Sequence, residues 1–449
     1  MDFIELPDIN SQIIKDLIEE HKNSKLPRYR KLMSYYKAKH DILDRTFDDP
    51  SKPNNKLVND YPGYIVDTIQ GYFIGIPAQY SAEKDEKFLA DLQDLFDSNN
   101  ETDHNAELAK YMGIYGEAFE LLYINDNSEI RFVRLKNEET MVVFDSSFQK
   151  SVQLALRYYT IYDTNLKKDI TKVELYYADR VDYYTQDGDS YSLERSVPHY
   201  FGKVPVIYYN NNDECMGDFE KVITLIDDYD KRVSDNSNEL EYFRNSYLKI
   251  KNMSGTTQED IIKIKQTGAF MVEGDGDVGF VEKNINDGYT EHHMERLDNN
   301  IHKFSKVPNL SDENFAGNLS GVAIKYKLWP IEQIASCKER KFRTGLRRRI
   351  KLITEIFRIQ GKNYNWKDIK IAFKRNIPSN LLELSQIAAN VKGIVSDETL
   401  LSILPFVEAP DKELEKIKAE QEDGLNYALL TSLYKTKTDK EAVKTGKSV

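Results

Sequence analysis

The chain has 449 residues, of which 40% are hydrophobic and 30% are charged, and its 74 acidic residues outnumber its 62 lysines and arginines. This composition excludes a disordered or membrane-embedded chain. The net charge of -12 argues against a protein that coats nucleic acid non-specifically, because tight phosphate binding requires clustered cations. The length allows about two to four domains, each with a core of its own.

Targeting segments and cysteine sites are not indicated. Residues 1–7 lack the basic start and apolar core of a signal peptide, and no apolar run reaches the roughly 18 residues that a spanning helix needs. We therefore expect synthesis in the cytoplasm and no membrane contact. Cys215 and Cys337 lie far apart and outside any Cys-x-x-Cys or Cys/His spacing, so neither a disulfide framework nor a zinc site is expected.

The first quarter of the chain has helical periodicity. Helices are expected at residues 9–39, 64–73, 85–96 and 103–115. Ser11 is a candidate N-terminal cap for the first helix, and Gly75 suits the end of the second. A linker rich in proline and asparagine is expected between these two helices, at residues 49–55.

After Gly116 the pattern changes to short runs rich in β-branched and aromatic residues. Strands are expected at residues 118–124, 129–135, 140–144, 152–162, 173–177 and 181–185, and a further extended piece at 198–209. Consecutive short strands joined by tight turns predict an antiparallel meander and exclude a parallel nucleotide-binding sheet. The chain is therefore expected to be a helix-rich α+β protein.

A stalk is predicted in the middle of the chain. An apolar stripe begins near Asp218 and continues toward Tyr247, and a helix of roughly 30 residues would span about 45 Å. An insert follows at residues 252–284, with a helix at 258–265 and strands at 269–272 and 278–281; the next helix, at 289–307, leads back. Long helix, small insert and returning helix predict a protruding stalk with a small head.

The last part of the chain opens with a polar, glycine-bearing loop at residues 308–321. A long helix follows, interrupted by Pro330, and then a strand at 369–374. Further helices are expected at 378–391, at 397–403 with Ser396 as cap, and over the charged segment 411–423; the polar tail 435–449 is expected to be mobile.

Catalytic signatures are absent from the sequence. It contains no phosphate-binding P-loop, nucleophile elbow, zinc-protease motif or dinucleotide fingerprint. Asp275 and Asp277 have an incomplete calcium-loop spacing, for which a hairpin turn is the simpler interpretation. A metal-dependent nucleic-acid-processing enzyme that uses a cluster among Asp227, Asp228, Asp275 and Asp277 remains the alternative hypothesis, and no cofactor is expected.

Basic residues concentrate on one helix. They are Lys338, Arg340, Lys341, Arg343, Arg347, Arg348, Arg349, Lys351 and Arg358. Three successive arginines cannot share one face at 100° per residue, so these residues form a collar around the helix. Contact with acidic neighbours, in the same chain or in another subunit, is favoured over contact with phosphate.

Three stretches resemble the portal proteins of tailed bacteriophages, in particular those of long-tailed phages with Gram-positive hosts. The first stretch comprises residues 55–68 and 71–77, the second 217–235 and 238–243, and the third 319–328 followed by the basic helix. With the order of the elements, the resemblance extends to about Ile403.

The resemblance implies a portal-like architecture. Residues 1–217 would form a wing of helices and antiparallel sheet, 218–248 a wing and stem helix, 249–287 a small α/β clip, and 288–307 the second stem helix. Residues 308–321 would be a tunnel loop, 322–377 the long kinked helix with a wing strand, and 378–449 a helical crown with a mobile tail.

The implied function is a structural one. About twelve subunits would form a closed ring at one capsid vertex, the channel through which double-stranded DNA is packaged and ejected. The implied partners are the terminase large subunit, a head-completion adaptor, and scaffolding and major capsid proteins. The protein would reside in the virion, after assembly in the host cytoplasm. A different structural ring or adaptor of the virion is a further alternative.

The resemblance also assigns candidate residues. The tunnel loop would present polar side chains that touch DNA weakly and release it: Asn309, Ser311, Asp312, Asn314, Asn318 and Ser320. The clip would bind its partners through Lys263, Lys265, Glu273, Asp275 and Asp277. The arginines of the collar are assigned to contacts between subunits: Arg340, Arg343, Arg347, Arg348 and Arg349.

Overall fold

A computed structural model defines the fold over most of the chain. It describes residues 9–50, 52–148, 150–164, 167–243, 248–251, 257–259, 262, 277–280, 287–310, 321–377, 381–404, 407, 410 and 412–421. Two compact units divide the chain, Met1–Asn376 and Ile377–Val449. Helices and small antiparallel sheets share the first unit, so the predicted α+β class is confirmed.

The N-terminal segment forms two helices where one was predicted. α1 (Ser11–Ser24) ends just before α2 (Leu26–Tyr36) begins, and Pro27 occupies the first turn of α2, where its missing N–H is tolerated. The cap of α1 is Asn10, whose side chain accepts a hydrogen bond from the Ile13 amide at 3.0 Å. The prediction of Ser11 as the cap is wrong: its hydroxyl accepts a bond from the backbone of Tyr191 at 2.7 Å.

The next three helices agree with the predictions. They are α3 (Tyr61–Ile74), α4 (Glu86–Ser98) and α5 (Glu101–Tyr115). The Asp60 carboxylate caps α3 by accepting from the Gly63 amide at 2.9 Å, and Gly75 follows its last residue, as predicted. Gly116 follows α5 with a φ of +85°, a conformation that glycine adopts without strain.

The predicted meander is a five-stranded antiparallel sheet. Its strands, in order, are β4 (Thr140–Phe144), β5 (Val152–Asp163), β6 (Lys168–Tyr176), β7 (Arg180–Asp187) and β8 (Ser190–Pro198). β8 was not predicted: it is an edge strand that is exposed along almost its whole length, so its sequence lacks the apolar alternation that marks a half-buried strand.

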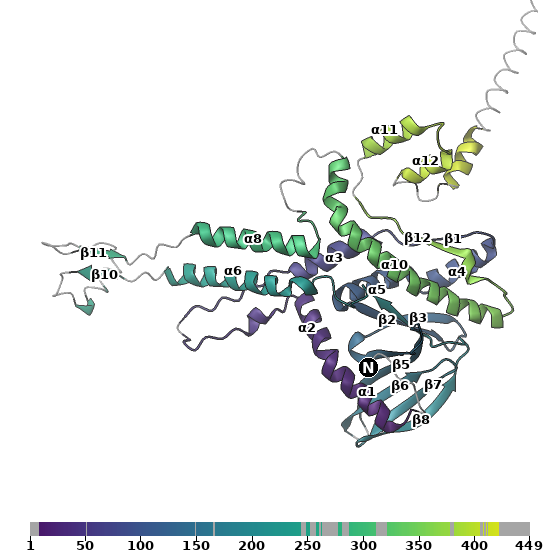
Figure 1. Ribbon diagram of the computed structural model, residues 1–449, viewed down its shortest axis with the longest axis horizontal. Coiled ribbons are helices and arrows are strands. Elements are labelled where there is room, and N and C mark those ends of the chain that lie inside the picture. The colour runs from purple at the N-terminus through teal and green to yellow at the C-terminus, as the bar shows by residue number, and fades with distance from the viewer. Residues whose placement is uncertain are drawn as a thin grey trace, which may run out of the picture. The chain divides into compact units, whose positions relative to one another are not determined.

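A second, three-stranded sheet has the order β3 (Ile130–Leu135), β2 (Glu117–Ile124) and β9 (Val206–Asn210). The first two predicted strands belong here and not to the meander. Alternate residues of β5 face opposite cores: Leu154 packs with Ile14 and Leu17 of α1, whereas Ala155 packs with Phe119 of β2. Helix α1 thus covers one face of the meander and the second sheet covers the other (Figure 1).

The middle of the chain contains the predicted helix pair. The single 3-10 turn η3 (Glu220–Val222) leads into α6 (Ile223–Phe243), and α8 (Asp287–Ser305) packs beside it in the opposite direction (Figure 1). α6 has 21 residues; residues 244–247, at the end of the longer predicted helix, lie outside the described part.

Between these helices in the sequence, β10 (Leu248–Lys251) pairs antiparallel with β11 (Asp277–Phe280). β11 matches the predicted strand at 278–281, whereas β10 was not predicted. Of the predicted helix at 258–265, residues 258, 259 and 262 are described and helical. The predicted strand at 269–272 lies outside the described residues.

The longest helix is α10 (Gly321–Ile359), whose 39 residues include Pro330. It packs against β9 and α3. After it, the single turn η4 (Trp366–Asp368) leads into β12 (Ile369–Ala372), which confirms the predicted strand. Its antiparallel partner, β1 (Gln79–Ala82), is too short to have been predicted from its pattern.

The second unit contains α11 (Leu381–Val391) and α12 (Asp397–Ile403). Ser396 caps α12, as predicted, by accepting a hydrogen bond from the Thr399 amide at 3.3 Å. Residues 412–421 are helical, in agreement with the predicted charged helix. The tail 435–449 lies outside the described residues.

Candidate functional site

The base of the helix pair is fixed by one buried carboxylate. Asp230 of α6 is fully buried. One of its oxygens lies 2.5 Å from Nδ1 of His40, and the other accepts hydrogen bonds from the backbone amide and the side-chain amide of Asn59 at 2.8 and 2.9 Å. A buried carboxylate is stable only when such partners replace its hydration. Asp230 therefore joins α6 to two segments far away in the sequence.

The same face of α6 continues this contact along the extended segment 54–59. Ser234 accepts a hydrogen bond from the Leu57 amide at 2.9 Å, and Asn238 accepts from the Asn55 amide at 2.7 Å. Residues 230, 234 and 238 are four apart and therefore lie in one row on the helix. We call this row, with the segment 54–59 bound to it, the polar ladder.

Helix α3 holds the first residues of the polar loop. The Tyr64 hydroxyl donates to the Pro308 carbonyl at 2.7 Å and accepts from the Leu310 amide at 3.0 Å. Tyr61, one turn earlier, donates to Asp298 of α8 at 2.7 Å. His302 of α8 lies edge-on to both tyrosine rings. The start of the loop and the end of α8 are thus attached to the same helix.

A polar cavity of about 420 Å³ lies at this attachment and is lined by residues of the segment 54–59, α3 and α8 together with Asn309. Asn309 is the one candidate loop residue that the structure describes. The other candidates, Ser311, Asp312, Asn314, Asn318 and Ser320, lie outside the described residues.

Arg349 is not available to another subunit, and its assignment to a subunit contact is wrong. Its side chain is fully buried: one guanidinium nitrogen lies 2.7 Å from Glu120 and another 3.2 Å from Glu101. Burial alone would raise the pKa of Glu120, but the charges of Arg349 and His104 lower it to about 2. The sequence allowed the collar to contact acidic residues of the same chain or of another subunit; Arg349 contacts acidic residues of its own chain.

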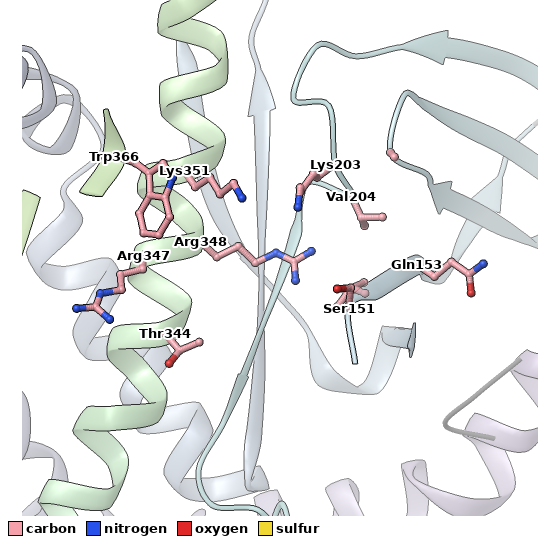
Figure 2. Close-up of a pocket in the computed structure, with 11 residues that line it drawn as sticks. Ser151, Gln153, Lys203, Val204, Thr344, Arg347, Arg348, Lys351 and Trp366 are labelled. Carbon is pink, nitrogen blue, oxygen red and sulfur yellow. The ribbon is translucent and has the colours of Figure 1, made fainter. Parts of the chain in front are cut away.

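Other members of the collar are also paired within the chain. Lys338 forms a buried ion pair with Asp218 at 2.5 Å, Lys341 pairs with Asp213, and Arg343 pairs with Glu339 while remaining 30% exposed. Arg340 and Arg347 are exposed, and Arg348 is half-buried. Arg347 and Arg348 line a cavity beside α10 (Figure 2).

Asp227 and Asp228, two of the four aspartates of the alternative metal cluster, contact different partners and do not share a site. Asp227 accepts a hydrogen bond from Tyr35 at 2.5 Å, and Asp228 lies 3.2 Å from His293 of α8. Burial raises the pKa of Asp227. Across the described ranges, no three histidine, cysteine or acidic side chains gather as metal ligands would. Asp275 lies outside those ranges, and Asp277 pairs with Lys251 in the β10–β11 ladder.

The clip candidates are mostly beyond the described part of the chain. Lys263, Lys265, Glu273 and Asp275 lie outside it, and Asp277 is placed by its backbone in β11.

The polar ladder and the Glu101–Glu120–Arg349 cluster were not predicted from the sequence. A spacing of four between Asp230, Ser234 and Asn238 was the available signal for the ladder, but the same spacing is typical of a solvated helix face.

The fold and the site define an α+β protein whose antiparallel helix pair is attached to a sheet-bearing body. Residues 15–426 match the family described as phage portal protein, SPP1 Gp6-like, and the chain belongs to this family.

Two portal proteins illustrate the relationship. That of Bacillus phage SPP1 is 26% identical over 445 residues, which cover 93% of this chain and 87% of the relative. That of Clostridium phage phiCD119 is 25% identical over 417 residues, or 86% of this chain and 91% of the relative. The predicted portal family is therefore confirmed. No described helix combines the length and hydrophobicity that crossing a bilayer requires.

Proposed function

We propose that the protein assembles into a closed ring of about twelve subunits at one capsid vertex and forms the channel through which double-stranded DNA is packaged and ejected. Membership of the portal family is the observation that carries this proposal. The ring is formed in the host cytoplasm and becomes part of the virion. Its partners there are the scaffolding and major capsid proteins.

The proposed domains follow the structural elements. The helices and sheets before residue 218 form the wing, α6 and α8 the stem, and residues 249–287 the clip. The segment 308–321 is the tunnel loop, α10 runs from this loop back to the wing, and the unit after residue 377 is the crown. The packing of α6 against α8 and the pairing of β10 with β11 support the stem and clip assignments.

The tunnel loop is proposed to line the channel. Its start is held by two hydrogen bonds to Tyr64, which fix the base of the loop to α3. Polar side chains without clustered cations suit this position, because each neutralised phosphate adds affinity by counterion release and would slow translocation. The net charge of -12 favours a channel that releases DNA readily.

The clip is proposed to bind the terminase large subunit during packaging and the head-completion adaptor afterwards, through Lys263, Lys265, Glu273, Asp275 and Asp277. Subunit contacts are proposed for Arg340, Arg343, Arg347 and Arg348, which are all at least partly exposed in the single chain. Charge complementarity would then set the register of neighbours in the ring.

Two experiments test the proposal. Native mass spectrometry and electron microscopy of the purified protein should show closed rings of about a dozen subunits, and a stable monomer at micromolar concentration would contradict the proposal. Deleting residues 309–318 should leave ring assembly unchanged but impair DNA packaging in vitro. Normal packaging by this variant would refute the tunnel-loop assignment.

A further inference from the structure

A cationic cavity of about 550 Å³ lies between α10, η4, the start of β5 and the segment before β9. Figure 2 shows Arg348 and Lys351 reaching from α10 toward Lys203 on the opposite wall, while Arg347 points to the other side of the helix. Of the four basic residues that line the cavity, Lys203, Arg348 and Lys351 therefore turn their charged ends toward one another. Trp366 forms part of its apolar wall and lies 5.7 Å from the Lys351 ammonium.

These three cations lack a balancing carboxylate in the described part of the chain, where no ion pair involves any of them. The charge of Lys351, followed by burial, lowers the pKa of Lys203, and burial lowers the pKa of Arg348. Glu355, which acts weakly on Lys203, is paired with Arg358 at 2.5 Å. The single subunit thus holds like charges together at an energetic cost.

Arg348 gives a second, independent indication of a missing partner. Its Nε is buried and has no hydrogen-bond acceptor among the described residues, and an unsatisfied buried donor is a costly exception in native proteins. Arginine in such a position is suited to a carboxylate, which it can bind through two parallel hydrogen bonds. The cavity is also large enough for several side-chain groups, since its volume falls in the usual range for ligand pockets.

We propose that this cavity receives carboxylate side chains from a second copy of the chain, so that the charge cluster of Lys203, Arg348 and Lys351 is completed only in the assembled ring. This inference rests on the proposed ring. A second copy is the favoured occupant because each chain carries an excess of 12 negative charges and because a ring brings one copy against the next at every interface.

Zero-length crosslinking with a carbodiimide tests the contact directly, because it joins an amine to a carboxylate only where the two groups touch. Rings are assembled from mixed ¹⁵N-labelled and unlabelled subunits, and the crosslinked peptides are identified by mass spectrometry. We expect Lys203 or Lys351 to be joined to an acidic residue of a differently labelled subunit. Lys362 and Asp91, which lie 2.7 Å apart in one chain, provide the internal control for the reaction.

Two results of the crosslinking would overturn the inference. One is rings in which the control link forms but neither Lys203 nor Lys351 is linked to another subunit. The other is a link from these lysines to a carboxylate of the same subunit, which would make the occupant a segment of the chain itself. Failure of the wild-type protein to form rings would refute the proposed function as well, so the two failures are distinguishable.

A pair of variants separates this role from a purely structural one. Arg348→Gln with Lys351→Gln should raise the protomer concentration at half-assembly about tenfold or more, yet raise the Tm of the isolated subunit by about 2 °C or more, because repulsion is relieved. Lys374→Gln with Lys392→Gln makes the same change of charge on exposed residues after α10 and should alter neither quantity. Unchanged assembly of the cavity variant would contradict the proposal.

A free polyanion is the competing occupant, with pyrophosphate as the probe. If the cavity belongs to a carboxylate of the neighbour, pyrophosphate should compete with that carboxylate and weaken both assembly and the crosslink from Lys351. Pyrophosphate that strengthens assembly of the wild-type protein, but not of the Arg348→Gln and Lys351→Gln variant, would identify a free anion as the occupant and overturn the inference.

Discussion

Replacing Asp230 by alanine should be among the most destabilising single changes in the protein. The carboxylate has three donors around it: Nδ1 of His40, and the backbone and side-chain amides of Asn59. Each hydrogen bond to a charged group contributes about 1.5–3 kcal/mol, but bonds to one side chain are not additive. A buried donor left without an acceptor costs about 1–3 kcal/mol, so we expect the loss of the shared acceptor to lower the free energy of unfolding by about 3 kcal/mol or more.

The assay is urea unfolding of the isolated subunit, followed by far-UV circular dichroism, with Asp235→Ala as the matched control. Asp235 lies on the same helix and pairs with Arg45 at 2.7 Å, but its side chain is 41% exposed, so its loss should cost less than about 1 kcal/mol. Equal effects of the two substitutions would refute the reasoning, since burial is the difference between them. Hydrogen exchange should also accelerate at residues 55–59 in the Asp230 variant alone.

Three further changes have defined outcomes. Arg349→Leu should lower the free energy of unfolding by about 3–5 kcal/mol at neutral pH. In the wild type, the depressed pKa of Glu120 stabilises the fold above about pH 4.5, and this contribution is lost as the pH falls toward 2. Acid unfolding curves that match between wild type and variant would contradict the pairing. Burial and Lys25 lower the pKa of His21 from 6.5 to about 4; stability should therefore decline as the pH falls from 6.5 to 4, and His21→Gln should flatten this decline in urea titrations at pH 7 and pH 5. Tyr64→Phe removes both hydrogen bonds to the loop and should cost about 1–2 kcal/mol while speeding amide exchange at Leu310, whereas an unchanged exchange rate would show that the loop is held by other contacts.

Periodicity predicted most helices and strands because their apolar faces are buried against one continuous body. Prediction from periodicity failed for segments that are exposed or too short to show an alternation of apolar and polar residues. β8 is an exposed edge, and β1 has four residues. The first helix was predicted as one because Pro27 falls where a proline can begin a helix as well as interrupt one. Local pattern also could not predict which strands pair: β2 pairs with β9, more than 80 residues away in the sequence.

The polar contacts were less predictable because the same charged residue types occur both as solvated surface side chains and as buried, paired ones. Three consecutive arginines must point in different directions, but the sequence does not tell which one points inward. Arg349 does, because Glu101 and Glu120 meet it from two other elements. Asp230 likewise has the spacing of a solvated residue, and the segment that covers it comes from a linker about 170 positions earlier in the chain.

The polar ladder has a mechanical consequence. A chain segment bound at only one point can take up a displacement by turning about its own bonds, but residues 55, 57 and 59 are each bound to α6. The segment is therefore stiff, and movement of α6 must be passed on to α3, which begins at Tyr61. Because Tyr64 of α3 also holds Pro308 and Leu310, α6, α3 and the start of the loop are joined by one continuous series of hydrogen bonds.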